Sequence, residues 1–252
     1  SFFFFLDKFN EHLSAKGIVF ACSMYNIQHT VTPVNGKLQV KLECERPDVE
    51  IRYTMDGKEP TDRSLLYKSP LMVTGTQTIK CTTYRAGRQM GKTLTLPLVW
   101  NKATAKPVLG NTQAGKILVN GIRGSLRQSD FEWHSWESSD SVAFTIDLQK
   151  KESLRSVSVG CITNYGMAAH KPADIEVWVS NDNRDYRKVS GKQFTDGEIF
   201  REGTFKEDVV LDLNKEIGRY VRIIAKGAGE CPATHVRPGQ EARIYFDEVM
   251  IE

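Results

Sequence analysis

The sequence predicts an all-β protein that consists of two β-sandwiches in succession, preceded by one short helix. Segments of the last third alternate apolar and polar residues, as half-buried strands do, and they are SVAFTIDL (141–148), DIEVWVSND (174–182), GRYVRIIAKGAGECP (218–232) and ARIYFDEVMIE (242–252). Segments of the same kind recur between residues 26 and 98, with turn residues at roughly the 8–12-residue spacing of a β-sandwich.

Length and charge exclude several classes of protein. A chain of 252 residues is long enough for two domains with separate cores. Its 34 Lys and Arg nearly balance its 31 Asp and Glu, and no basic cluster stands out, which argues against a nucleic-acid partner. Since no apolar run approaches the ~20 residues of a membrane-spanning helix, we also expect no membrane span.

The first element is a predicted helix over residues 2–16, which ends at Gly17 and is followed by a short strand at 18–20. Its apolar positions fall on one helical face and are Phe2, Phe5, Leu6, Phe9 and Leu13. Phe3 and Phe4 widen the apolar surface beyond one stripe, so we expect a large partner upstream in the chain. The segment lacks the basic start and the cleavage-like small residues of a signal peptide.

The middle of the chain predicts a small immunoglobulin-like sandwich. An Asp56-Gly57 pair gives a strong turn signal after one of its strands. The predicted strand segments lie at residues 37–44, 50–61, 76–84 and 93–98. About 70 residues with this spacing suit a sandwich of two small antiparallel sheets.

The five cysteines are widely spaced, without a Cys-x-x-Cys motif, at Cys22, Cys44, Cys81, Cys161 and Cys231. Most are expected to be buried free thiols, because free Cys packs as a small hydrophobic residue. The best candidates for a disulfide are Cys44 and Cys81, which lie in predicted strands of the same sandwich.

Residues 100–111 carry Pro107 and Gly110 and predict a linker or the first edge of the next domain. The predicted domains are therefore residues 1–25, a terminal helix and strand; residues 26–103, the immunoglobulin-like sandwich; and residues 104–252, the second sandwich.

Two families are recognisable in these segments. The middle segment resembles the chitobiase/β-hexosaminidase C-terminal domain at Ile51, Tyr53, Thr54, Asp56, Gly57, Pro60, Thr61, Tyr67, Pro70 and Leu71. In their order and amino-acid sequence, the strand segments of the last third resemble a discoidin-type (coagulation factor C-type) domain. Such a domain is a jelly-roll β-sandwich that binds sugars or other ligands with its loops. Residues 6–28 and 229–252 look like the last barrel helix and the ending of bacterial β-N-acetylhexosaminidases.

These resemblances imply a C-terminal accessory fragment of a glycoside hydrolase, whose catalytic (β/α)₈ barrel would precede it and be its partner. The parent enzyme would remove terminal N-acetylhexosamine and would be periplasmic, extracellular or on the cell surface of a bacterium. The resembled enzymes place their catalytic Asp-Glu pair in the barrel.

We predict no catalytic residues in this chain. Glycosidases need two carboxyl groups that converge on one bond. The adjacent pair Asp247 and Glu248 lies in a predicted strand, where neighbouring side chains point to opposite faces. Cys231 and His235 are four residues apart, but no second Cys or His cluster completes a metal site.

Three loops carry the residue types of a sugar site, which pairs an aromatic face with a few polar groups. The candidate residues are Trp133, His134 and Trp136 in the first loop, Tyr165 and His170 in the second, and His235 and Arg237 in the third. Trp133 and Trp136 could equally close the end of the sandwich as core residues. The expected ligand is a glycan with N-acetylhexosamine or galactose.

The resemblance also implies a structural calcium ion near an Asp-Gly loop and a C-terminal Glu. The matching residues are Asn120, Ser125 and Glu248, with Asn120 where Asp is usual. Calcium takes six to eight oxygen ligands, so backbone carbonyls would have to supplement this weakly charged set.

Two alternatives to sugar binding stay open. The sandwiches could be purely structural and brace the catalytic domain without any ligand. The second sandwich could also be an adhesion module for protein or lipid. That function predicts apolar loop tips, whereas these loops are rich in charge and His.

Overall fold

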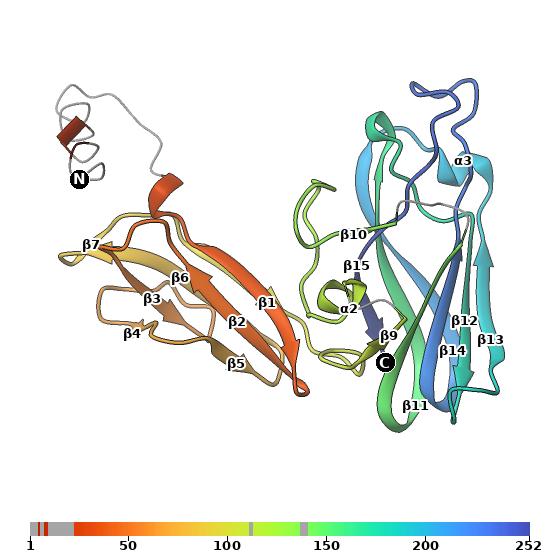
Figure 1. The fold of residues 1–252 in the computed structure, drawn as a ribbon, viewed down its shortest axis with the longest axis horizontal. Helices are drawn as coiled ribbons and strands as arrows, with labels where there is room; N and C mark the ends of the chain where they lie inside the picture. Colours follow the sequence, from red (N-terminus) through yellow and green to blue (C-terminus); the bar gives the residue numbers. More distant parts are fainter. Residues whose placement is uncertain (1–4, 6–7, 10–22, 111–112, 137–140) are drawn as a thin grey trace. The chain divides into compact units, whose positions relative to one another are not determined.

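The computed structural model describes residues 5, 8–9, 23–110, 113–136 and 141–252, and it confirms the all-β prediction (Figure 1). Phe5, Lys8 and Phe9 are helical. The rest of the predicted helix 2–16 and the predicted strand 18–20 lie outside the described residues.

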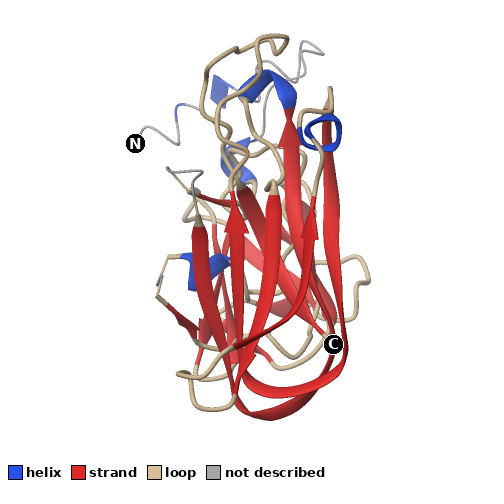
Figure 2. Cartoon of the chain, turned by 90° about the vertical axis from the view of Figure 1, so that its right-hand side faces the viewer, coloured by secondary structure: helices blue, strands red, loops and turns tan. Residues whose placement is uncertain are grey.

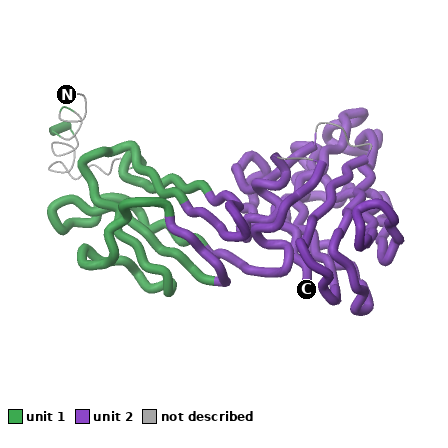
Figure 3. The backbone as a smooth tube through the Cα atoms, turned by 60° about the horizontal axis from the view of Figure 1, so that its bottom comes forward, with its two compact units in different colours: residues 1–30, 41–70, 77–96 green, residues 31–40, 71–76, 97–252 purple. Residues whose placement is uncertain are grey.

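The chain divides into two compact units (Figure 3). The first comprises residues 1–30, 41–70 and 77–96, and the second comprises residues 31–40, 71–76 and 97–252. The domain boundaries expected from the sequence stay a prediction.

The immunoglobulin-like part consists of two antiparallel sheets. One sheet has the order β1-β2-β5, and the other has the order β4-β3-β6-β7 with β8 also paired to β6. The elements are η1 (Ser23–Tyr25), β1 (Gln28–Val34), β2 (Lys37–Glu43), β3 (Glu50–Thr54), β4 (Leu65–Leu66), β5 (Leu71–Val73), β6 (Gln77–Arg85), β7 (Arg88–Gln89) and β8 (Leu94–Leu98).

Local sequence explains these strands. In β2 the side chains of Leu38, Val40 and Leu42 are buried and those between them are not, as period-2 alternation requires. After β3, the side chain of Asp56 accepts the Lys58 amide at 3.2 Å, and Gly57 takes a φ of 76° that favours glycine.

The suggested disulfide between Cys44 and Cys81 is wrong, because both are free cysteines in this structure. The Cys44 thiol follows β2 and donates to the Met24 carbonyl at 3.3 Å. Cys81 lies on β6, in the other sheet, where burial raises the pKa of its thiol to about 12. Cys161 and Cys231 are also free, as the sequence predicted for most cysteines.

The second sandwich is built on one sheet path, β10-β15-β11-β14-β12-β13, with β9 paired to β11. Its elements are β9 (Val108–Leu109), α2 (Ala114–Ile117), β10 (His134–Ser135), β11 (Val142–Asn164), η2 (Tyr165–Met167), β12 (Asp174–Ser180), β13 (Arg187–Gln193), α3 (Asp196–Ile199), β14 (Thr204–Lys226) and β15 (Tyr245–Ile251).

The long strands β11 and β14 pair over their whole length and join the two layers. Their register shifts between Asp147 and Glu152 and again between Leu154 and Ser156, and the ribbon curves around at this end (Figure 2). On one side of the shifts β14 pairs with β12, and on the other side β11 pairs with β15. Apolar side chains from both halves form one buried cluster that includes Phe144, Val159 and Phe246.

No helix among the described residues is long and apolar enough to cross a membrane.

Candidate functional site

The second and third candidate loops meet at the end of the second sandwich that also carries α3, and the first loop lies lower along the sandwich, where β10 pairs with β15 (Figure 1). Asn164, at the end of β11, donates its side-chain amide at 2.9 Å to Gln128, which directly precedes the first loop. The amide of His170 donates to the carbonyl of Arg243 at 3.0 Å, which joins the second loop to the third. The structure therefore brings together segments that are 36 and 73 residues apart in the chain.

His170 and His235 form a hydrogen-bonded pair at the centre of this end. Their Nε2 atoms are 3.2 Å apart, and both side chains are buried. Nδ1 of His170 lies 3.0 Å from the Ile199 carbonyl, which only accepts, so we assign the proton of His170 to Nδ1. Nδ1 of His235 accepts the Arg237 amide at 3.0 Å, so His235 carries its proton on Nε2 and donates it to His170.

The surroundings of this pair favour neutral imidazoles. The pKa of His170 falls to about 4, because burial lowers it more than the Ile199 carbonyl raises it, and His235 lowers it as well. Burial also lowers the pKa of His235. At neutral pH the pair is therefore an uncharged link between two loops.

Cys231 lies close enough to the two histidines to suggest a metal site. The candidate ligand atoms of His170, Cys231 and His235 all lie within 4.8 Å of one another. A metal on Nε2 of His235 would have to displace its proton while Nδ1 still accepts the Arg237 amide. Burial also raises the pKa of the Cys231 thiol, which disfavours the thiolate that a metal needs. The observed hydrogen bonds thus fit a metal-free arrangement.

Tyr165 and Arg237 surround the histidine pair on its outer side. The Tyr165 ring lies 3.9 Å from the His235 ring, centroid to centroid, and is half-buried. The exposed guanidinium of Arg237 donates to the Gly166 carbonyl and, at 3.2 Å, to the side chain of Gln240. These contacts hold a ring and a cation at the surface of the loop end.

Trp133 is buried, with 6% of its surface exposed, which favours the alternative in which it closes the sandwich. Its Nε1 donates to the Ser125 carbonyl at 3.0 Å. A Cβ on Gly124 would lie 2.3 Å from the indole, so the ring packs directly on that glycine.

Trp136 and His134 also face inward more than outward. The Trp136 ring stacks on Phe144 at 6.1 Å and meets Phe246 edge-on at 5.3 Å. His134 lies edge-on to Trp136 at 4.5 Å, and burial lowers its pKa. Both side chains are half-buried, so each leaves some surface for a ligand.

Phe131 is the candidate that sequence reasoning missed. Its side chain is 96% exposed. It sits in a turn that is closed by the Trp133 amide on the Asp130 carbonyl at 3.2 Å, and this turn directs it to solvent. The flanking acids Asp130 and Glu132 were the signal that this aromatic residue lies at a loop tip.

The residues expected at a calcium site lie near one another but already have partners. Oδ1 of Asn120 accepts the Ile122 amide at 2.9 Å, and Oε2 of Glu248 accepts the Gly121 amide at 3.0 Å. The Ser125 hydroxyl bonds to Asp130 instead.

Asp247 and Glu248 lie in β15, and both are fully buried. Oδ2 of Asp247 accepts Nε of Arg123 at 3.0 Å. Burial raises the pKa of Glu248 well above its usual range, and the charge of Asp247 raises it further. A substrate cannot reach either carboxyl group in this packing.

Comparisons with known proteins match both halves of the chain. Residues 102–237 match the family model of the F5/8 type C domain, and residues 32–95 match that of the chitobiase/beta-hexosaminidase C-terminal domain. No curated protein sequence matches the chain.

Several solved structures are distantly similar. CBM32-6 from Clostridium perfringens is 17% identical, with a TM-score of 0.34 over 58% of this chain and 90% of its own. CBM32-5 from the same organism, in complex with GalNAc-β-1,3-galactose, is 14% identical, with a TM-score of 0.37 over 57% and 91%. The C-terminal domain of a chitobiase from Bacteroides fragilis is 10% identical, with a TM-score of 0.31 over 52% and 76%. These likenesses are too distant to assign a ligand.

Proposed function

The chain belongs to the F5/8 type C domain family, and from that premise we propose that its second sandwich is a non-catalytic module that binds carbohydrate. The observation that supports this most is the meeting of the second and third loops at one end of the sandwich, with the exposed tip of the first loop on the same domain. At this end Tyr165 offers a ring face and Arg237 offers a donor for sugar hydroxyls, and the first loop adds the exposed ring of Phe131. An aromatic face with a few polar groups is the usual composition of a sugar site.

The proposed ligand is a glycan that contains N-acetylhexosamine or galactose. The match of residues 32–95 supports a role as an accessory fragment of a bacterial β-N-acetylhexosaminidase. We further propose that the protein works in the periplasm or outside the cell, where glycans that contain these sugars are found.

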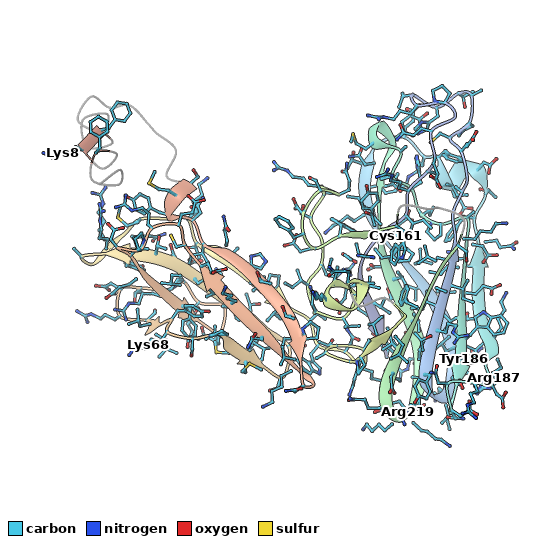
Figure 4. All side chains as sticks on the ribbon, viewed as in Figure 1. Lys8, Lys68, Cys161, Tyr186, Arg187 and Arg219 are labelled. Atoms are coloured by element: carbon cyan, nitrogen blue, oxygen red, sulfur yellow. The ribbon has the colours of Figure 1, made fainter. Side chains whose placement is uncertain are left out.

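A glycan array on the whole chain tests this proposal, followed by titration calorimetry on any sugar that binds. Phe131→Ala and Arg237→Ala should each weaken binding about tenfold or more, because each removes a surface contact. Tyr186→Ala is the matched control, since this aromatic residue lies at the opposite end of the same sandwich (Figure 4). Binding that is equally weakened by the control would point away from the loop end.

The purely structural alternative predicts that the chain binds no sugar. It is favoured by the burial of Trp133 and by the histidine pair, whose Nε2 atoms bond to each other rather than to a ligand. An array without response to N-acetylglucosamine, N-acetylgalactosamine or galactose would favour it over carbohydrate binding. Turnover of a chromogenic N-acetylglucosaminide by this chain would contradict the non-catalytic part of both proposals.

One observation favours adhesion to a lipid surface as a second candidate. Among the exposed apolar side chains are Phe131, Val236 and Met167, which are 96%, 64% and 48% exposed and lie in the three loops. Apolar loop tips of this kind can insert into a membrane interface. Co-sedimentation with phosphatidylcholine and phosphatidylserine vesicles, lost in Phe131→Ala, would support this candidate.

A further inference from the structure

We propose that Arg123 and Lys206 supply the positive charge at the place where the family resemblance implies calcium, so that this loop holds its shape without a metal ion. The loop comprises residues 120–125 and packs against β14 and β15.

Arg123 bridges two acidic residues from different strands. Its Nε donates to Oδ2 of Asp247 on β15 at 3.0 Å, and its terminal nitrogens donate to both carboxylate oxygens of Asp208 on β14. Asp247 is fully buried, and Arg123 is 29% exposed at its side chain. A guanidinium bridges two carboxylates with fixed geometry, as a divalent ion would with its coordination shell.

Lys206 and Trp133 occupy two backbone oxygens of the loop. The Lys206 ammonium group donates to the Gly124 carbonyl. The next carbonyl, that of Ser125, accepts Nε1 of the buried Trp133 at 3.0 Å. Calcium would need such carbonyls as ligands, and here they already face a cation and an indole donor.

Two side-chain oxygens already accept hydrogen bonds from the loop backbone. Asn120 and Glu248 accept the amides of Ile122 and Gly121. Within the described residues, neither Oε1 of Glu248 nor the side-chain nitrogen of Asn101 has a hydrogen-bond partner, but Asn101 is near enough to lower the pKa of Glu248. An amide donor in this position repels a cation rather than completing its coordination.

Asp247 has no free oxygen for a metal either. Its Oδ2 also accepts the Gly124 amide at 2.8 Å, and its Oδ1 accepts the Glu248 amide at 2.6 Å. The nearby Gly160 leaves just enough room, because a Cβ there would lie 2.6 Å from a terminal nitrogen of Arg123. The backbone of β11 can therefore pack directly against Arg123 because residue 160 has no side chain.

The test is the melting temperature of the whole chain with excess EGTA and with millimolar calcium chloride. We expect the two values to agree within about 1 °C, since a site that binds calcium at this concentration would raise Tm by mass action. A calcium-dependent rise of several degrees would overturn the proposal.

The arginine is tested by Arg123→Met, which should lower Tm by about 6 °C or more because it leaves Asp247 buried without its cation. Arg127→Met is the matched control, two residues beyond this loop, where the side chain is exposed, and it should change Tm by no more than about 1 °C. Equal melting temperatures for the two variants would overturn the role of Arg123. The calcium comparison needs no variant, so the proposal stays falsifiable even if Arg123→Met does not fold.

Discussion

Trp133 and Phe131 lie two residues apart in one loop, yet their surroundings are opposite. Trp133 is 6% exposed and donates a hydrogen bond to the loop that packs beneath it, whereas Phe131 is 96% exposed at the tip of a turn. The buried ring contributes to stability, and the exposed ring is free to contact a partner.

Trp133→Ala should therefore lower the free energy of unfolding by about 3–5 kcal/mol, as expected for loss of a buried aromatic side chain. Phe131→Ala should change it by no more than about 0.5 kcal/mol. Urea denaturation of both variants measures the difference. A Phe131→Ala variant as unstable as Trp133→Ala would mean that the loop tip is packed against something.

The histidine pair makes stability depend on pH. The pKa of His170 is about 4 in the folded chain and 6.5 in the unfolded chain, so the unfolded chain binds more protons between these values. The contribution of His170 to the free energy of unfolding is therefore fully present above about pH 6.5, and it is lost as the pH is lowered through about 4.

We expect His170 to account for a loss of about 3 kcal/mol across this window, at 1.36 kcal/mol per unit of pKa. The measurement is urea denaturation at several pH values between 7 and 4, with His170→Gln as the control. The variant should be less stable than the original protein at pH 7, and its free energy of unfolding should fall less on acidification. A parallel pH dependence in both proteins would show that other groups cause the acid sensitivity.

At the scale of elements, the β11–β14 ribbon determines where the functional parts lie. Its register shifts let one pair of strands contribute to both layers, and β11 then ends at Asn164, where the second loop begins. On the way it passes Asp247 of β15 at Gly160, where a Cβ would lie 1.9 Å from Oδ1 of that aspartate. A glycine is required here because of close approach, not because of its φ.

Gly160→Ala should accordingly lower the free energy of unfolding by about 2 kcal/mol, as overpacking does in a tight core. Gly197→Ala in α3 is the matched control, because a Cβ there meets nothing within 4 Å. It should be neutral or slightly stabilising, since Ala is the better helix former. Equal stability of the two variants, measured by thermal unfolding, would contradict the close packing of Asp247 against β11.

At the scale of the whole molecule, the two matched families follow one another along the chain, in the order that the motifs predicted. The strand segments at 37–44, 50–61, 76–84 and 93–98 correspond to β2, β3, β6 and β8, although β3 ends at Thr54, before the turn. These segments were predictable because apolar alternation and the Asp-Gly turn are local properties.

The candidate site was predictable only in part. The sequence identified the three loops, but it gave Trp133 equal chances of binding and closing and did not single out Phe131. Burial depends on which residues from distant segments pack against a side chain, and no local pattern reports that.

The sequence by itself determined the all-β class, the order of the two sandwiches and the loops that carry aromatic and cationic residues. Only the tertiary structure decided that His170 meets His235, that Arg123 joins Asp208 to Asp247, and that Cys44 and Cys81 stay apart. Strand patterns and turns arise from interactions between near neighbours in the chain. Pairings across 65 or 124 residues depend instead on strand register and on the bend of the β11–β14 ribbon.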